Sequence, residues 1–286
     1  AHEFFSSEDI PLAYWATSPR RPNPSSRDSY ANPMKRFSRH LLQLFWGAVL
    51  LHLVWILGYL LISSPVLPAP WQVYEHLTHL DGTELLGHTL ASFRRIAWGV
   101  LVATGLASSV ALLMYLFPKV GRVVSTFIYF SYPIPKLALL PIVMLLAGLG
   151  EATKVVMIVL IILFQLIVSI RDALRGISSE HHALLRSLGA GRRAELRHLL
   201  LPATLPAMLS ALRIALGTAI SVLFVTETYG TTRGLGYYIT DAWMRLDYLG
   251  MYAGIALLSI SGVLLFILID WLEQLLCPWQ SSTKVE

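Results

Sequence analysis

Charged residues and cysteine are both scarce in this sequence. Of its 286 residues 14% are charged and 55% are hydrophobic, and the mean hydropathy is +0.61. Because a soluble domain carries roughly 25% charged residues, this balance excludes a soluble globular protein and indicates an integral membrane protein. The one cysteine, Cys277, excludes an internal disulfide and a cysteine-rich metal site.

Motifs that carry chemistry are also missing. The phosphate-binding pattern GxxxxGK[ST] occurs nowhere, so the chain encodes no ATP site. An intramembrane hydrolase would need paired aspartates, an HExxH metal pair, or a serine and a histidine at membrane depth, and none is evident. The interpretation is therefore a protein that is not an enzyme and holds no cofactor of its own.

The excess of basic residues does not indicate a nucleic-acid partner. The formal charge is +5 and the pI is near 9.4, but lysines and arginines gather at the ends of apolar runs, as orientation signals of membrane proteins do. Residues 64 to 93 contain no lysine or arginine, whereas residues 171 to 203 hold six arginines against three acids. The positive-inside rule therefore places the second segment in the cytoplasm and the first outside.

Apolar runs predict an all-α, polytopic membrane fold with six transmembrane helices and both termini in the cytoplasm. The runs cover residues 41 to 62, 95 to 117, 123 to 147, 155 to 170, 203 to 225 and 250 to 276. The third is interrupted by Pro133, Pro135 and Pro141 and should be bent, so that it lines a cavity. Residues 1 to 40 and 277 to 286 should be tails, the first of them mobile, 41 to 63 an extra helix, and 85 to 276 a five-helix core.

Small residues recur every four positions in two of these runs. Gly99, Ala103, Ala107 and Ala111 do so in the second, and the alanines at 203, 207, 211, 215 and 219 do so in the fifth. Such stripes allow neighbouring helices to approach closely, so we expect both helices to pack tightly in the membrane.

A polar stretch from residue 178 to 206 separates two apolar runs. Its helical spacing brings Leu184, Leu185 and Leu188 onto one face, and Gly189 and Gly191 then break the helix before a second one begins. The stretch predicts a helix, a turn and a helix outside the bilayer, which we interpret as a docking element within residues 176 to 202.

This stretch resembles the "EAA" loop of the membrane subunits of bacterial ABC importers. Gly189, Leu199, Leu201 and Pro202 match the second half of that pattern. The Glu-Ala-Ala positions are Ala183, Leu184 and Leu185, so the acidic residue is missing and Glu180 is the candidate substitute. The resemblance implies that an ATPase docks on a surface made by Glu180, His181, Ala183, Leu184, Leu185, Leu188, Gly189, Leu201 and Pro202.

Residues 131 to 154 and 211 to 239 also resemble permeases of the nitrate, sulfonate and taurine group, within the type I ABC importers. The resemblance implies a subunit of the bacterial inner membrane. Its implied partners are two cytoplasmic ATP-binding subunits that use ATP and Mg²⁺, a second permease copy or a paralogue, and an external substrate-binding protein.

Two cations inside predicted spans, Lys136 and Arg213, bear on the solute. A cation at membrane depth costs about 2.5 to 3.5 kcal/mol, so each should face a cavity or a partner. Pro133, Pro135, Lys136, Arg213 and Glu227 are candidates for the substrate pathway, although Arg213 could equally form an ion pair with a carboxylate of another span. The resemblance adds that the solute is a small anion, with a pyrimidine-like precursor as the alternative.

Two further alternatives involve histidine. Glu180, His181, His182 and His198 resemble a loose metal cluster, but adjacent helical residues point apart, so a solvated face is the better interpretation. A haem-binding electron carrier could use His52 and His88. These two sit at different predicted depths, so we interpret them as packing or interface residues.

Overall fold

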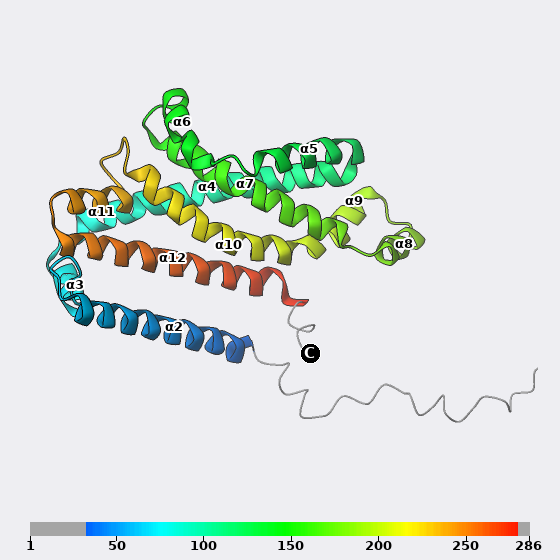
Figure 1. Ribbon diagram of the computed structural model, residues 1–286. Coiled ribbons are helices and arrows are strands. Elements are labelled where there is room, and N and C mark those ends of the chain that lie inside the picture. The colour runs from blue at the N-terminus through cyan, green and yellow to red at the C-terminus, as the bar shows by residue number, and fades with distance from the viewer. Residues whose placement is uncertain (1–32, 280–286) are drawn as a thin grey trace, which may run out of the picture. The chain divides into compact units, whose positions relative to one another are not determined.

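The computed structural model describes residues 33 to 279, and in this range the chain is built from helices without strands (Figure 1). The all-α fold class is thus confirmed. The helices are α2 (Pro33–Ile62), α3 (Pro70–His79), α4 (Gly82–Leu116), α5 (Pro118–Ser131), η2 (Lys136–Leu139), α6 (Leu140–Ala147), α7 (Glu151–Arg175), α8 (Ser179–Ser187), α9 (Arg192–Glu195), η3 (Leu196–Leu200), α10 (Leu201–Glu227), α11 (Leu235–Met244) and α12 (Tyr248–Leu276). The described residues from His52 onward form one compact unit, and the earlier part of α2 belongs to another.

Five of these helices are long and apolar enough to cross a membrane, and a sixth span results if one bent pair counts as a span. That pair is α5 followed by η2 and α6, and it bends by 87°. The break between Ser131 and Lys136 contains Pro133 and Pro135, which cannot donate the hydrogen bonds that would continue a helix. The predicted bend of the third span is therefore confirmed.

Two helix starts differ most from the predicted ones. The second span begins at Gly82 rather than at residue 95, because the Asp81 carboxylate accepts a hydrogen bond of 2.9 Å from the Thr83 amide and caps the helix there. The helix α2 begins at Pro33, inside the segment predicted as a mobile tail. The rest of that tail, and residues 280 to 286 of the other, lie outside the described residues.

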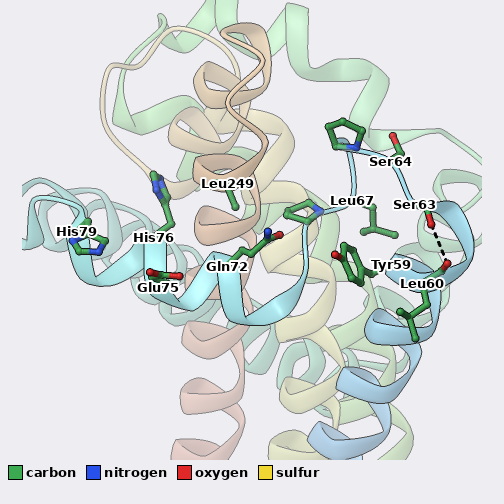
Figure 2. A pocket seen from close by; sticks show the side chains of 12 residues that line it. Tyr59, Leu60, Ser63, Ser64, Leu67, Gln72, Glu75, His76, His79 and Leu249 are labelled. Carbon is green, nitrogen blue, oxygen red and sulfur yellow. Dashed lines mark hydrogen bonds between the residues drawn. The ribbon is translucent and has the colours of Figure 1, made fainter.

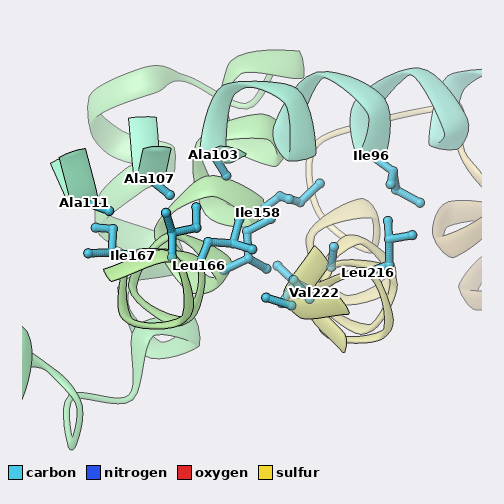
Figure 3. Close-up of a cluster of buried hydrophobic side chains, with 14 of the residues drawn as sticks. Ile96, Ala103, Ala107, Ala111, Ile158, Leu166, Ile167, Leu216 and Val222 are labelled. Carbon is cyan, nitrogen blue, oxygen red and sulfur yellow. The ribbon is translucent and has the colours of Figure 1, made fainter. Parts of the chain in front are cut away.

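The core is formed where α7 packs against both α4 and α10 (Figure 3). The predicted stripe of α4 is buried, with Ala103, Ala107 and Ala111 all 0% exposed. A Cβ on Gly99 would lie 2.6 Å from Ile158 Cγ2, so only glycine fits at this contact between α4 and α7. In α10 the stripe is buried at Ala211, Ala215 and Ala219 but exposed at Ala203, where the helix emerges from the core.

Candidate functional site

The predicted helix-turn-helix is present as α8, a short turn and α9, and α9 continues through the π-helical turn η3 into α10. The second half of the polar stretch is therefore continuous with a spanning helix that packs in the core, and the turn separates α8 from it.

Gly189 ends α8 in a left-handed conformation, with φ of +74°. Its amide donates to the carbonyl of Arg186 at 3.0 Å, and the amide of Ala190 donates to the carbonyl of Leu185 at 3.0 Å. These two bonds form a Schellman motif, in which the last free carbonyls of a helix are satisfied by a residue that favours glycine. Gly189 thus sets the direction in which the chain leaves α8.

His182 holds α8 against two other helices. Its Nδ1 lies 2.6 Å from Glu195 Oε1 of α9, and its Nε2 lies 3.3 Å from the Tyr115 hydroxyl near the end of α4. The rings of Tyr115 and His182 also stack, with centroids 6.4 Å apart. The sequence singled out His182 as a possible metal ligand, but the described residues contain no group of three histidine, cysteine or acidic side chains suited to a metal.

The leucines of α8 differ in exposure. Leu184 is 59% exposed and Leu188 is 73% exposed, whereas Leu185 is half-buried. Glu180, His181 and Ala183 are exposed on the same helix, and His181 Nδ1 lies 2.6 Å from the Ser178 hydroxyl. Of the remaining predicted docking residues, Gly189 and Leu201 are exposed and Pro202 is half-buried. Leu184 and Leu188 are therefore two exposed apolar side chains, one helical turn apart.

Lys136 lies just after the bend between α5 and α6. Its Nζ donates to the carbonyl of Ser131 at 3.3 Å and lies 5.4 Å from the ring centre of Tyr132 and 5.1 Å from that of Phe164. Aromatic faces attract a cation without neutralising it. Across the described chain no carboxylate pairs with Lys136.

Arg213 differs from Lys136 in having acidic partners. Its Nη2 contacts Asp270 and lies 2.6 Å from Glu273 Oε2, and both acids belong to α12. The alternative in which Arg213 forms an ion pair with another span agrees with this geometry. The pair connects α10 to α12 and leaves less of the Arg213 charge for a solute.

Glu227 is fully buried and belongs to a cluster of charges that the sequence did not reveal. Arg95 Nη1 donates to Glu227 at 2.6 Å and Arg95 Nε donates to Glu151 at 2.8 Å, while the Ser92 hydroxyl lies 2.9 Å from both oxygens of Glu227. The amide of Gly236 donates to the same carboxylate at 2.8 Å. Both oxygens of Glu227 thus have partners within the chain. A contact between Glu227 and the substrate stays a prediction.

A second buried cation, Lys154, completes this cluster. Its Nζ donates to the carbonyl of Leu149 at 2.6 Å and to that of Gly230 at 3.1 Å. Lys154 is 1% exposed and Arg95 is 2% exposed. Two cations and two carboxylates thus join α4, the beginning of α7, the end of α10 and two loops in a network of balanced charge. Charged residues inside spans mark functional or paired sites, and this rule could have found Arg95. It did not, because the span was expected to begin at Arg95, which would have placed this residue at the membrane surface.

The two histidines considered for haem have contacts within the protein. His52 Nε2 contacts the Tyr74 hydroxyl, and His88 Nδ1 lies 3.1 Å from the backbone of Gly234. The ring of His88 also lies against Tyr237 and Tyr238, with centroids 6.0 and 5.5 Å away. Both histidines therefore take part in contacts within the protein.

Comparison with known proteins agrees with this architecture. A family model described as "Binding-protein-dependent transport system inner membrane component" matches residues 99–279. The formylaminopyrimidine transport permease protein of Halalkalibacterium halodurans is 32% identical over 82% of this chain and 94% of its own length. The taurine transport system permease protein of Escherichia coli K12 is 34% identical over 83% of this chain and 89% of its own length.

A solved structure has the same fold. A chain of the MetNI methionine ABC transporter, in inward-facing conformations, matches with a TM-score of 0.60 and 20% identity, over 68% of this chain and 97% of that chain. This match shows that the chain has the type I permease fold. The similarity in sequence comes from the two permeases above.

Proposed function

Because the chain belongs to the family of inner membrane components of binding-protein-dependent transport systems, we propose that it forms half of a pathway for a small anionic solute. It is the membrane-spanning, non-catalytic subunit of an ABC importer, and ATP is hydrolysed by separate subunits. Permeases of this kind work with ATP-binding subunits and with substrate-binding proteins. We further propose the class of solute, the number of each partner and the orientation of the termini.

The observation that carries the anion proposal is Lys136. It is a half-buried cation at the bend of the broken span, held by a carbonyl and two aromatic rings rather than by an acid. A cation without an acidic partner attracts anions, and a broken helix is tolerated in a membrane where it lines a cavity. The taurine permease among the relatives supports a sulfonate.

The experiment is transport by the reconstituted importer with Lys136→Met, beside Lys119→Met as the control. Lys119 is an exposed cation on the preceding helix α5. We expect Lys136→Met to abolish sulfonate uptake and Lys119→Met to leave it unchanged. Normal uptake by Lys136→Met would remove the anion argument.

A pyrimidine-like solute is the second candidate, and the formylaminopyrimidine permease among the relatives favours it equally. A neutral heterocycle needs ring stacking more than a cation, and Tyr132 and Phe164 lie beside Lys136. Uptake of a radiolabelled pyrimidine, with no uptake of sulfonate, nitrate or bicarbonate, would decide for this candidate. In that case Phe164→Ala should impair uptake more than Lys136→Met.

The proposed assembly has two copies of this chain, or this chain and a paralogue, with two cytoplasmic ATP-binding subunits that use ATP and Mg²⁺. The exposed apolar side chains of α8 support docking of an ATPase on Leu184 and Leu188. We expect Leu188→Asp to leave the protein in the bacterial inner membrane but to uncouple ATP hydrolysis from uptake. The adjacent exposed Ser187→Asp is the matched control.

The proposed orientation has both termini and α8 in the cytoplasm. It rests on the arginines of residues 171 to 203 and on the absence of lysine and arginine from residues 64 to 93. A cysteine placed at Arg192 should stay unlabelled by an impermeant reagent in intact cells. Labelling there would overturn the orientation, and the mass of the intact complex would separately fix the number of copies.

A further inference from the structure

A cavity of about 780 Å³ lies beside α3 at the end of α2 (Figure 2). One wall is apolar and includes Tyr59, Leu60, Leu67 and Leu249. The other wall is polar and comes from α3, which contributes Gln72, Glu75, His76 and His79. Because these positions follow the spacing i, i+3, i+4 and i+7, they share one face of the helix. The cavity therefore has the two-sided character that an amphipathic ligand requires.

Gln72 of the polar wall accepts a hydrogen bond of 2.9 Å from the Ala69 amide, whereas the other three side chains of this wall have no partner among the described residues. The carboxylate of Glu75 and the imidazole of His79 form no hydrogen bond or ion pair with any described residue. His76 Nε2 is buried and likewise has no hydrogen-bond partner in this part of the chain. Elsewhere at this end of the protein the acids Glu151, Glu227 and Asp241 are paired with arginines. A buried polar atom without a partner is rare, so His76 Nε2 indicates a polar ligand group that satisfies it, and the exposed side chains of Glu75 and His79 lie open to the same ligand.

The cavity lies where spanning helices end. The apolar stretch of α2 ends at Ile62, three residues after Tyr59, and α12 begins at Tyr248, next to Leu249. Trp71 packs edge-on against Tyr59 with ring centroids 5.6 Å apart. Aromatic side chains gather at the boundary between hydrocarbon and headgroups, so the cavity is at the depth of lipid headgroups.

We propose that this cavity binds a phospholipid with an ammonium headgroup, of the phosphatidylethanolamine type. The carboxylate of Glu75 would accept hydrogen bonds from the ammonium, and the imidazoles of His76 and His79 would donate to the phosphate. The first acyl carbons would lie against Leu60 and Leu67. A headgroup that carries only negative charge would be repelled by the Glu75 carboxylate. Glu75 therefore selects the zwitterionic lipid, whose ammonium compensates the carboxylate.

The lipid would add to a small set of contacts that attach the end of α2. Trp55 Nε1 donates to the carbonyl of Pro68 at 3.0 Å, and the Trp55 ring stacks on Tyr252 of α12 with centroids 5.6 Å apart. The cavity lies beside these contacts and touches α2, α3 and α12 together. A bound lipid therefore fastens α2 to the ends of its two neighbours.

The test is native mass spectrometry of the full-length chain released from nanodiscs with equal amounts of phosphatidylethanolamine and phosphatidylglycerol. We expect one retained phosphatidylethanolamine on the wild type. Glu75→Gln should reduce its retention by about tenfold, the effect of losing one charge-assisted hydrogen bond. Glu75→Lys should reverse the preference toward phosphatidylglycerol, which a general loss of structure could not do. Thr78→Ala, on an exposed residue of the same helix, is the control.

Three outcomes would overturn the proposal. The first is equal retention of the two lipids by the wild type. The second is unchanged retention by Glu75→Gln and Glu75→Lys. The third is a variant at Glu75 that keeps the lipid but binds the loaded substrate-binding protein more weakly, which would make the cavity a protein-docking site. None of these outcomes depends on which solute the importer carries.

Discussion

Arg95 and Glu227 are 132 residues apart in the chain, yet the Nη1 of one lies 2.6 Å from the Oε1 of the other, with the side chains 2% and 0% exposed. Arg95 uses its other donors on Glu151, the Thr231 hydroxyl and the carbonyl of Arg233. One side chain of α4 therefore holds the ends of α7 and α10 and the loop that follows α10. Motion of the end of α10 relative to α4 would have to break the pair of Arg95 and Glu227.

The first prediction is that Arg95→Met destabilises the protein strongly. It leaves Glu227 buried without its cation, and removal of one partner from a buried pair costs about 3 to 5 kcal/mol. Thermal unfolding of the purified protein, followed by size-exclusion chromatography, measures this loss. Arg94→Met is the control, since Arg94 is 63% exposed, lies 3.4 Å from Glu151, and should contribute about 1 kcal/mol or less. Equal stability of the two variants would show that the buried pair does not hold the helix ends.

The second prediction compares two glycines of the same helix, α4. Alanine normally stabilises a helix by about 1 kcal/mol over glycine, and no atom lies within 4 Å of a Cβ built on Gly105. Gly105→Ala should therefore raise the unfolding temperature slightly. Gly99→Ala should lower it, because the new Cβ would lie 2.8 Å from Ile158 Cβ. The same sign of change for both variants would contradict the close approach of α4 and α7.

The third prediction concerns the turn after α8. Gly189→Val would place a branched side chain at φ of +74°, at a cost of about 1 to 2 kcal/mol or more. We expect reduced coupling of ATP hydrolysis to uptake with little change in the amount of protein in the membrane. Gly189→Asn should keep more coupling, since asparagine also ends helices in this conformation. Identical coupling in both variants would mean that the Schellman motif is not required for docking.

The fourth prediction separates two roles of Arg213. If Arg213 only holds α12 through Asp270 and Glu273, then Arg213→Met lowers the unfolding temperature, and uptake per folded molecule stays normal. We expect this result. A variant with normal stability and no uptake would assign Arg213 to the pathway instead. Arg245→Met, which breaks an ion pair at a side chain that is 62% exposed, gives the baseline for losing a surface pair.

Local patterns in the sequence predicted much of the fold. The bend after α5 could be predicted from the prolines at 133 and 135 alone. The turn after α8 could be predicted from the glycine at 189 that follows a short helix. The stripe of α4 needs only a spacing of four residues. Each of these features is decided by neighbours along the chain, so each could be read without knowledge of tertiary contacts.

The charge cluster could not be predicted in this way. The partners of Arg95 come from positions 56 to 138 residues away, and no local pattern shows which distant loops meet. A boundary error added to the difficulty, since Asp81 caps α4 well before the apolar run begins and so places Arg95 inside the helix. The contacts of His182 with Tyr115 and Glu195 were also missed, because both partners belong to other helices and no local pattern shows which helices meet.

The 87° bend between α5 and α6 also constrains how the protein is made. The 14 residues of α5 would reach about 21 Å, and the four of η2 with the eight of α6 about 20 Å, at 1.5 Å per α-helical and 2.0 Å per 3₁₀ residue, short of a hydrocarbon layer of about 30 Å. Each piece alone is therefore too short to cross the bilayer. This part of the chain can cross only if both pieces enter together, with α5 packed against α4 and α6 packed against α7.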